Sequence, residues 1–538
     1  MATVRLPLIF QIQSRTANPF KDSKMVNAYK EGNQAEKRPG LAGLTITPTL
    51  PVAVGQGIFQ YTGSIFTVIN NAIYKVTGNT SSFIGSIIGD VKPISFTSTF
   101  NNNYLFFHNQ TNGYYYSTSG GLVQLTASSV ISATITIAGS GYTAAPNVVF
   151  SAPPSGGVTA TGTADYDSVS GAITGITITN RGSGYTDPPT ITIDPPTSGV
   201  TAEATATLNY FPTDLVPGAA YLDGYVAVMT TGGRIYTCNA SDVTAWGALD
   251  YISSNSQPDL GTGITSHLNY IVAFNQWSTQ FFYDAANPTA SPLAVNPSAN
   301  LEIGCANGNS IAKFEQTVVW VGQSNSAGKG VYLLNGIQPI KISNQYIDKY
   351  LDADGLRNCT GYGIKFQGHS WYVLSLPDTD ITLVFDIDEK VWSFWTSTIG
   401  RVEQFFVGDF STYLNGLTYI QDSINGELYY LDDATYTDAD GPISFRLVSP
   451  LLDADTQDRK FISRVEVVGD KYDCILRIRH TDDDYQHWSQ YRNVNLGDQR
   501  PVLYQNGSTR RRAYELFSTD NAPIRVDVME MEITKGDN

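Results

Sequence analysis

The residue types on which most catalytic and metal sites depend are scarce in this sequence. Its 538 residues include only five histidines and four cysteines. The cysteines are scattered and form no Cys-x-x-Cys pair, so we expect free, buried thiols in a protein made in a reducing cytosol, and no zinc site. They are Cys238, Cys305, Cys359 and Cys474.

Long apolar runs and the motifs of common enzymes are also missing. No run reaches the roughly 18 apolar residues that a membrane-spanning helix needs. The N-terminal stretch lacks the pattern of a secretory signal, so we expect none. Neither Gly-x-Ser-x-Gly nor a P-loop with Gly-Lys-Ser/Thr occurs. These absences argue against a serine hydrolase of the elbow type and against a P-loop nucleotide enzyme.

Acidic clusters and one histidine leave a route to catalysis or metal binding. The runs HTDDD (480–484) and LDADTQD (452–458) lack the glycine and terminal glutamate of a calcium loop, which favours solvated loops. His369, in QGHSWYVL, is interpreted as a hydrogen-bonded strand histidine rather than a base. The segment DTDITLVFDIDEKVW holds four carboxylates, Asp378, Asp380, Asp386 and Asp388. Two of them could form the acid pair of a glycosidase, but aspartates at turns usually cap loops, which is the favoured interpretation. We therefore predict no enzyme, metal or cofactor.

The charge of the chain is acidic and uneven. The net charge is −16, which argues against tight binding to phosphate backbones, because that affinity comes largely from lysine and arginine. Residues 1–44 carry seven basic side chains against three acidic ones, which leaves about −20 on the rest. This asymmetry indicates a basic arm that docks onto a partner, attached to an acidic body. The seven are Arg5, Arg15, Lys21, Lys24, Lys30, Lys37 and Arg38.

What the sequence has in abundance is tyrosine, phenylalanine and glycine, in a recurring pattern of apolar strands and polar turns. Units of this kind begin near residues 57 and 92, and then near 218, 265, 310, 361 and 404, at intervals of about 43 to 51 residues. That interval is typical of a β-propeller blade with four strands. We therefore predict an all-β protein with a distorted β-propeller of about six or seven blades.

The interval is interrupted once, between residues 92 and 218. Removing residues 130–208 restores one blade length, so this segment is predicted to be an insertion. It contains GSGYT twice, in AGSGYTAAPNVVF and NRGSGYTDPPTIT, which predicts a small β module with pseudo-two-fold symmetry. We expect Tyr142 and Tyr185 to pack its core, and Pro146 and Pro189 to set turns. Its outer face is a candidate for docking a fibre or contacting a surface. A role as a spacer that thickens the protein is an equally favoured interpretation.

Five segments follow from these patterns. They are an N-terminal arm for docking and ring assembly (1–56), the first blades (57–129), the inserted module (130–208), the remaining blades (209–440) and a C-terminal β domain (441–538). The last segment alternates apolar and charged residues, which predicts antiparallel strands in a β-sandwich-like part. The best helix signal is SNQYIDKYLDADGLRN, from Ser343, with Ile347, Tyr350 and Leu351 on one face.

The densest basic run outside the N-terminal segment is TRRRAYELF. Because side chains alternate along a strand, one of Arg510, Arg511 and Arg512 must face opposite to the other two. An ion-paired interface is the favoured interpretation, and contact with phosphate is the alternative.

The order of several short motifs resembles the tail hub or nozzle proteins of short-tailed bacteriophages, the packaged-DNA stabilisation family. The motifs run from NPFKDSKMVNAYKEG and EKRPGL through AAYLDGYVAV, DVTAWGALDY and IVAFNQWSTQFFYD to LEIGCANGNSIAKFEQTVVWVG and GHSWYVLSLPDTDITLVFDIDEKVWSFW. The resemblance covers roughly residues 18–129 and 209–535; the insertion departs from it. By resemblance, the fold and assembly residues are Asn27, Tyr29, Arg38, Pro39, Gly40, Leu41, Trp246, Gly304, Cys305, Trp320 and His369.

The resemblance implies a structural tail protein of the virion, made in the host bacterial cytoplasm. It implies a homohexameric ring below the portal and adaptor rings, which continues the DNA channel, helps to retain the genome and anchors tail fibres or spikes. Double-stranded DNA would pass transiently without specific binding, and the distal tip would meet the host envelope. The alternatives are a carbohydrate-binding receptor protein and a propeller-type polysaccharide hydrolase.

Overall fold

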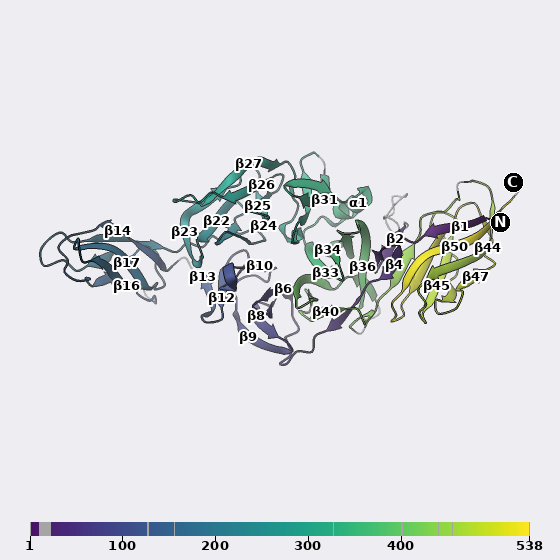
Figure 1. Ribbon diagram of the computed structural model, residues 1–538, viewed down its shortest axis with the longest axis horizontal. Helices are drawn as coiled ribbons and strands as arrows, with labels where there is room; N and C mark the ends of the chain where they lie inside the picture. The colour runs from purple at the N-terminus through teal and green to yellow at the C-terminus, as the bar shows by residue number, and fades with distance from the viewer. Residues whose placement is uncertain are drawn as a thin grey trace. The chain divides into compact units, whose positions relative to one another are not determined.

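The computed structural model describes residues 2–9, 23–125, 128–154, 156–326, 328–399, 402–439, 441–454 and 456–536 (Figure 1). The chain folds as two compact units, Met1–Ile87 with Ile303–Asn538, and Ile88–Glu302. Apart from three 3₁₀ turns and one α-helix, the regular elements of the described residues are β-strands. Within those residues no helix is long and apolar enough to cross a membrane.

The first unit holds propeller sheets from both ends of the chain. One sheet is an uninterrupted meander of β6 (Gly55–Tyr61), β7 (Ser64–Ile69), β8 (Ala72–Thr77) and β9 (Thr80–Ser86). A second has the same form, with β33 (Thr360–Phe366), β34 (His369–Leu376), β35 (Ile381–Asp386) and β36 (Val391–Ile399), to which β37 (Val402–Phe405) adds.

Two further sheets of this unit depart from the simple meander. In one, the first strand is split into β28 (Gly304–Cys305) and β29 (Ala312–Lys313), which both pair with β30 (Val318–Ser324). The sheet continues with β31 (Gly328–Asn335) and β32 (Gln338–Lys341). In the other, N-terminal β5 (Gly40–Gly43) completes β38 (Gly408–Leu414), β39 (Leu417–Asp422) and β40 (Leu428–Asp432), with short β41 (Thr437–Asp438) and β42 (Gly441–Pro442) beyond it.

The second unit contributes three uninterrupted meanders. They are β10 (Ser95–Ser98), β11 (Leu105–His108), β12 (Gly113–Ser117) and β13 (Gly121–Leu125); β20 (Ala220–Leu222), β21 (Tyr225–Met229), β22 (Arg234–Asn239) and β23 (Asp242–Ser253); and β24 (Gly261–His267), β25 (Tyr270–Asn275), β26 (Thr279–Asp284) and β27 (Leu293–Leu301). The predicted all-β propeller is thereby confirmed, and the interval of the sequence units is that of these sheets.

Tight turns explain why the strands form hairpins at these points. In the loop between β38 and β39, Asn415 and Gly416 both have positive φ, at 52° and 87°. The loop between β20 and β21 repeats this with Asp223 and Gly224, at 47° and 98°. Two consecutive residues with positive φ make a type I′ turn, whose twist matches that of the flanking strands, and Asn-Gly and Asp-Gly favour it.

The inserted module consists of six strands in three antiparallel pairs. In chain order they are β14 (Val130–Ile137), β15 (Val148–Phe150), β16 (Thr161–Asp167), β17 (Ala172–Asn180), β18 (Ile191–Ile193) and β19 (Glu203–Leu208). The pairs are β14 with β19, β15 with β18 and β16 with β17, so each pair joins one sequence copy to the other. The ends meet, since Asn209 N donates to Ser129 O over 2.7 Å. The module thus leaves and rejoins the chain at one point, which lies between the complete sheets β10–β13 and β20–β23 rather than in a loop within one blade.

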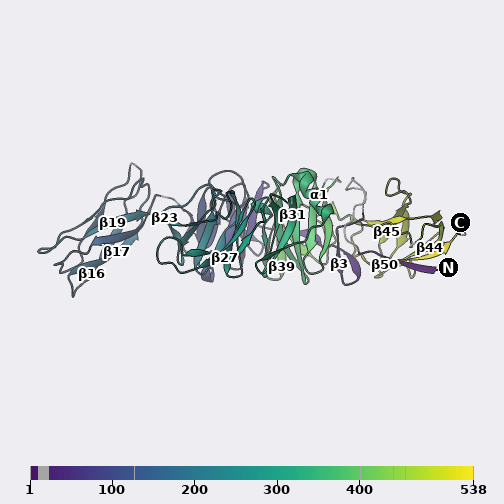
Figure 2. The same ribbon diagram turned by 90° about the horizontal axis from the view of Figure 1, so that it is seen from above.

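The C-terminal part is a sandwich of two sheets around one apolar core. Figure 2 shows β45 and β50 in different layers. One sheet contains β3 (Ala28–Glu31), β4 (Gln34–Lys37), β50 (Arg525–Lys535), β44 (Lys460–Gly469) and β47 (Val502–Tyr504), with β1 (Ala2–Pro7) and β48 (Ser508–Thr509) paired onto it. The other continues the blade of β36 through β2 (Lys24–Val26), β43 (Phe445–Val448), β49 (Ala513–Ser518), β45 (Ile475–Thr481) and β46 (Arg492–Asn495).

The described residues of the N-terminal segment do not form a separate arm. β1 pairs with β50, β2 lies between β36 and β43, and β5 closes the sheet of β40. The physical reason is strand pairing, because each of these short strands satisfies its backbone groups against a neighbour from the far end of the chain. Arg15 and Lys21 lie outside the described residues, and partner docking by this segment stays a prediction.

The predicted helix is confirmed as α1 (Gln345–Asp354). Asn344 caps it, since its side-chain oxygen accepts from the backbone N–H groups of Tyr346 and Ile347. It ends at Gly355, which has φ 76°. Its buried face consists of Ile347, Tyr350, Leu351 and Asp354. All four cysteines are free and buried, as predicted.

Candidate functional site

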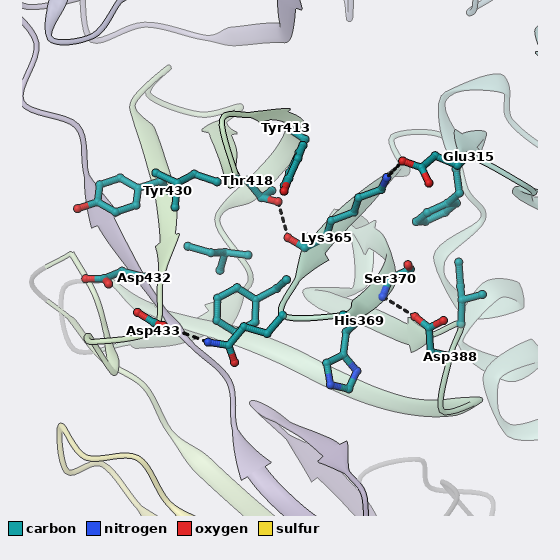
Figure 3. A pocket seen from close by; sticks show the side chains of 18 of the residues that line it. Glu315, Lys365, His369, Ser370, Asp388, Tyr413, Thr418, Tyr430, Asp432 and Asp433 are labelled. Atoms are coloured by element: carbon teal, nitrogen blue, oxygen red, sulfur yellow. Dashed lines mark hydrogen bonds and ion pairs between the residues drawn. The ribbon is translucent and has the colours of Figure 1, made fainter.

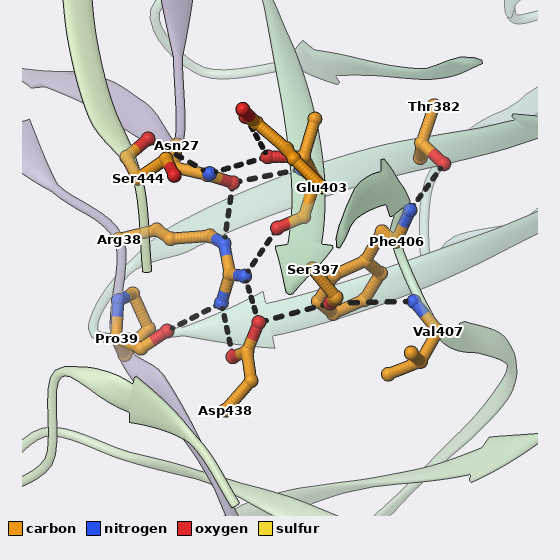
Figure 4. Close-up of polar contacts among 11 residues, drawn as sticks. Asn27, Arg38, Pro39, Thr382, Ser397, Glu403, Phe406, Val407, Asp438 and Ser444 are labelled. Atoms are coloured by element: carbon orange, nitrogen blue, oxygen red, sulfur yellow. Dashed lines mark hydrogen bonds and ion pairs between the residues drawn. The ribbon is translucent and has the colours of Figure 1, made fainter. Parts of the chain in front are cut away.

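Arg38 lies at the centre of a buried polar cluster where the N-terminal segment meets a blade and the C-terminal part (Figure 4). Its side chain is 0% exposed. Nη1 and Nη2 donate to the two carboxylate oxygens of Asp438, Nη1 also donates to Pro39 O, and Nη2 to Thr396 O. Nε donates to Asn27 Oδ1. All five guanidinium N–H groups thus have acceptors, which is what burial of a charge requires.

Aromatic rings enclose the same guanidinium. Its carbon lies 4.9 Å from the centroid of the Phe406 ring and 5.4 Å from that of Trp395. A cation over a ring face is attracted by the ring quadrupole, and more strongly where water is excluded. The environment therefore holds Arg38 in one orientation.

Asn27 supplies the second half of this cluster. Its φ is 51°, a conformation that asparagine tolerates better than most residues. Its side-chain amide donates to Thr396 Oγ1 over 2.7 Å and to Ser444 O over 3.0 Å, and its oxygen accepts from Thr396 N over 2.9 Å. We call the set of Asn27, Arg38, Thr396 and Asp438 the N-terminal clamp.

The burial of these residues bears on the predicted docking set. Asn27 and Arg38 are fully buried and Tyr29 is 7% exposed, and Pro39 is buried as well. Tyr29 donates to Glu36 Oε2 over 2.8 Å, and burial, together with the Glu36 charge, raises the pKa of the phenol. In this geometry the four side chains pack within the subunit, and the docking role predicted for them stays a prediction.

His369 connects the β3–β4 hairpin to the blade beside it. Nδ1 lies 2.7 Å from Asp386 Oδ2, and Nε2 lies 2.7 Å from Glu31 Oε2. Burial lowers the pKa of the imidazole, but the hydrogen bonds to the two carboxylates outweigh it and raise the pKa to about 9. His369 is thus a charged bridge between two acids, in agreement with the interpretation of a hydrogen-bonded histidine.

An open pocket of about 580 Å³ lies beside this bridge (Figure 3). Its wall combines carboxylates, such as Asp388 and Asp432, with exposed aromatic surface such as Tyr413. Lys365 crosses it and forms an ion pair with Glu315 over 2.5 Å. The polar groups are thus largely engaged with one another rather than aimed at a common point.

The four carboxylates considered for a glycosidase do not converge. Asp378 and Asp380 flank the start of β35, whereas Asp386 ends that strand and Asp388 follows it. Only Asp388 of the four lines the pocket. Asp386 accepts turn bonds from the backbone of Asp388 and Glu389. The other three accept from residues 18 to 25 positions away: Asp378 from Asn358 Nδ2, Asp380 from Phe405 N and Asp388 from Ser370 N. Within the described residues, no group of three or more acidic, histidine or cysteine side chains could hold a metal ion.

The arginine run does not follow strand alternation, because Arg510 and Arg511 lie in a bend between β48 and β49 and are both exposed, whereas Arg512 is buried. Arg512 is buried and forms a bidentate pair with Asp482, over 2.6 and 2.7 Å. Arg511 is exposed and pairs with Asp484 over 2.9 Å, while Arg510 donates to the Gln457 carbonyl. These partners belong to the same chain, and the HTDDD loop binds two of the three arginines, Arg511 and Arg512. Contacts of Arg510 and Arg511 with another subunit stay a prediction. Asp455 lies outside the described residues.

The two tyrosines of the inserted module occupy equivalent buried positions. Tyr142 is 5% exposed and its hydroxyl accepts from Ala202 N over 3.0 Å. Tyr185 is 4% exposed and accepts from Ala160 N over 2.8 Å. Their expected place in the core is confirmed. Pro146 is half-buried and Pro189 buried, so neither presents a broad outer surface.

Sequence reasoning missed the partners that make these residues structural. Asp438 and Glu31 carried no local signal, because each lies more than 300 residues from the side chain it binds. Trp320 and Gly304 are nearer in sequence and stand in the same motif. In the structure they are hydrogen-bonded, since Trp320 Nε1 donates to Gly304 O over 3.1 Å.

A comparison with protein families found one family model that matches part of the chain. The family model described as "Bacteriophage P22 Gp10, beta-propeller" matches residues 206–436. Those residues belong to a phage tail family. The match spans less than half of the chain; it confirms the expected resemblance and indicates a phage tail β-propeller protein.

Solved structures are similar to the chain only at low identity and low TM-score. The extracellular domain of the putative one component system BT4673 from B. thetaiotaomicron is 10% identical, at a TM-score of 0.40, over 86% of this chain. The chain covers 48% of that domain, about half its length. BamB from Moraxella catarrhalis is 11% identical, at a TM-score of 0.34, over 80% of this chain and 97% of BamB. These likenesses are too low to bear on function. No curated protein matches the chain.

Proposed function

We propose that this phage tail β-propeller protein is the tail nozzle of a short-tailed phage. Six copies form a ring below the portal and adaptor, and the ring extends the DNA channel. It helps to retain the packaged genome, conducts it during ejection, and anchors tail fibres or spikes. The observation that carries the proposal is the family match over residues 206–436, in a chain whose motifs before and after that region resemble the same family.

The charge of the chain supports a conduit rather than a DNA-binding role. At −16, the protein repels phosphate, and DNA that passes an acidic wall slides without releasing counterions to it. The pocket beside His369 agrees with this, since most of its charged wall residues are carboxylates.

The internal connections of the first unit suit a part that carries load. The blade sheet of β33–β36 continues without interruption through β2 into the C-terminal sandwich. The N-terminal clamp fastens the same junction with a buried charge pair. The step from β36 to β2 is a single register pair, Val26 with Phe394, so the junction depends on this pairing and on the buried charge pair together rather than on a flexible linker.

The partners follow from this position in the virion. We expect the adaptor or portal-proximal ring on one side, tail fibres or spikes around the ring, and the host envelope at the distal tip. The protein is made in the host bacterial cytoplasm, in keeping with its four free thiols.

The mass of the native particle tests the proposal directly. Purified protein, examined by native mass spectrometry and negative-stain imaging, should form six-membered rings, and antibodies against it should label virion tails. Virions assembled without the protein should lose nuclease-protected DNA. A stable monomer or trimer in assembled virions would overturn the nozzle and favour a receptor protein.

A further inference from the structure

One outer face of the C-terminal sandwich carries an unusual set of side chains for so acidic a chain. On the sheet of β43, β49, β45 and β46, cationic and aromatic groups contact one another in a single cluster. We call it the arginine–aromatic face: Arg446, Arg477, Arg479, Trp488, Tyr491 and Phe517.

Stacking orders this cluster. The guanidinium carbons of Arg446 and Arg477 lie 5.3 and 5.8 Å from the centroid of the Phe517 ring. That of Arg479 lies 4.8 Å from the Trp488 ring and 4.5 Å from the Tyr491 ring. A guanidinium that stacks on a ring keeps its N–H edge free for carboxylates, and stacking lowers the entropy lost on binding.

The charges of this face are not balanced within the chain. Glu515, whose side chain is 2% exposed, pairs with Arg446 and Arg479 from below, and Glu403 lies 3.6 Å from Arg446, so the face has two glutamates for its three arginines. Arg477 is exposed, and no ion pair joins it to a carboxylate among the described residues. Tyr491 is 39% exposed. The face thus presents positive charge and ring surface to solvent together.

On the outer face of the opposite sheet of the same sandwich, the arginines form ion pairs within the chain. There Arg5 pairs with Glu530, Arg464 with Glu466 and Glu532, and Arg500 with Glu466. Three arginines meet three glutamates, and every arginine has a partner. The contrast between the two faces of one domain indicates that the arginine–aromatic face is kept for a partner.

We propose that the arginine–aromatic face docks onto an acidic surface of a second copy of this chain. Arginine, tryptophan and tyrosine are the residues that most often dominate binding energy at protein interfaces. The chain at −16 supplies the complementary charge itself. In a two-fold dimer this cationic face would meet the same face of the second copy, and the like charges would repel. In a head-to-tail contact it meets a different, acidic surface of the neighbouring copy, and repetition of that contact forms the proposed ring. The inference rests on the proposed ring and names the face that builds it.

Charge reversal at Arg477 tests the proposal, with Arg5→Glu as the matched control on the opposite sheet. The Arg5 side chain is 75% exposed, so charge reversal there removes only one weak surface ion pair, the pair with Glu530. Assembly is followed by sedimentation velocity against protein concentration and salt. We expect Arg477→Glu to weaken assembly by about tenfold or more, Arg477→Gln by less, and Arg5→Glu to match the wild type. Salt at about 0.5 M should weaken wild-type assembly as well.

The outcomes separate this inference from the proposed function. Wild-type protein that stays monomeric at all concentrations contradicts the ring itself. Rings of normal strength from Arg477→Glu overturn the docking face and leave the nozzle standing. If wild-type protein shifts DNA on a gel and Arg477→Glu does not, while assembly is unchanged, the face binds nucleic acid. That outcome would also overturn the docking of this face onto a second copy. Thermal melting of both variants within about 2 °C of wild type shows that folding is intact.

Discussion

The hydrogen bonds of the inserted module and those of the N-terminal clamp join residues at very different separations along the chain. In the module, Tyr185 reaches the backbone of Ala160, 25 residues away, and Tyr142 reaches Ala202, 60 residues away. In the clamp, Arg38 reaches Asp438 across 400 residues. The module is a duplication that supplies its own partners, whereas the clamp needs both ends of the chain in place. Four experiments probe this contrast.

The largest effect is expected from breaking the clamp. Arg38→Met leaves Asp438 buried without its counter-ion, which should lower the free energy of unfolding by roughly 3–5 kcal/mol. Arg181→Met is the control within the second unit, because its pair with Asp242 is partly exposed, at 37% and 39%, and should cost less than about 1 kcal/mol. Denaturant unfolding measures both. Equal costs for the two would contradict the central place of the clamp.

The His369 bridge should make the first unit sensitive to alkaline pH. Its folded pKa of about 9 lies above an unfolded value of about 6.5. A raised pKa contributes stability that is complete below pH 6.5 and lost as the pH rises through 9. The shift corresponds to roughly 2 kcal/mol once discounted for Glu31, which is 58% exposed.

Unfolding curves across that pH range check this expectation. Wild type should lose stability relative to His369→Gln as the pH rises from about 6.5 to 9. His487→Gln, which removes an 89% exposed imidazole, serves as the control and should follow the wild type. Parallel curves for wild type and His369→Gln would mean that the bridge is not charged.

The module should respond locally and symmetrically. Tyr142→Phe and Tyr185→Phe each leave a buried backbone N–H without an acceptor, which should cost about 1–2 kcal/mol. Tyr185→Phe should cost the more, since its hydroxyl also donates to Ser151 O. Hydrogen exchange at Ala202 and Ala160 measures each change. Loss of protection in the blades of the first unit would show that the module is not self-contained.

The smallest effect is expected from removing the module altogether. Because Ser129 and Asn209 are hydrogen-bonded neighbours, a chain without residues 130–208 can be closed by a short Gly-Ser link. Ring assembly, followed by native mass spectrometry, should remain that of wild type apart from the lost mass. Failure of the shortened chain to assemble would assign the module a part in the ring.

Local patterns predicted much of the fold. The interval of the units and the interruption at residues 130–208 predicted the blades and the insertion, since each blade carries its own strand and turn signals. Helix α1 was predicted to its cap because Asn344, the apolar face and Gly355 are all local signals. The buried tyrosines of GSGYT followed from the same logic.

The candidate site was predicted less well. Asn27, Arg38 and His369 were identified by resemblance, but their partners Asp438, Glu31 and Thr396 were not. Docking by the N-terminal segment was predicted from its basic charge, and Asn27, Tyr29, Arg38 and Pro39 were taken from the resemblance; neither signal indicated that Arg38 forms a buried ion pair. The arginine–aromatic face, spread over β43, β49 and β45 with the segment around Tyr491, had no motif at all.

The sequence by itself determined the class of fold, because blade length, turn residues and strand alternation are short-range properties that each unit repeats. It also determined the self-contained duplication, whose copies match each other in order. Only the tertiary structure decided that strands of the N-terminal segment belong to three different sheets, which charges are buried and which remain on a face. Those outcomes depend on pairing between residues hundreds of positions apart, and the cost of burying a charge is offset only where the partner arrives in space.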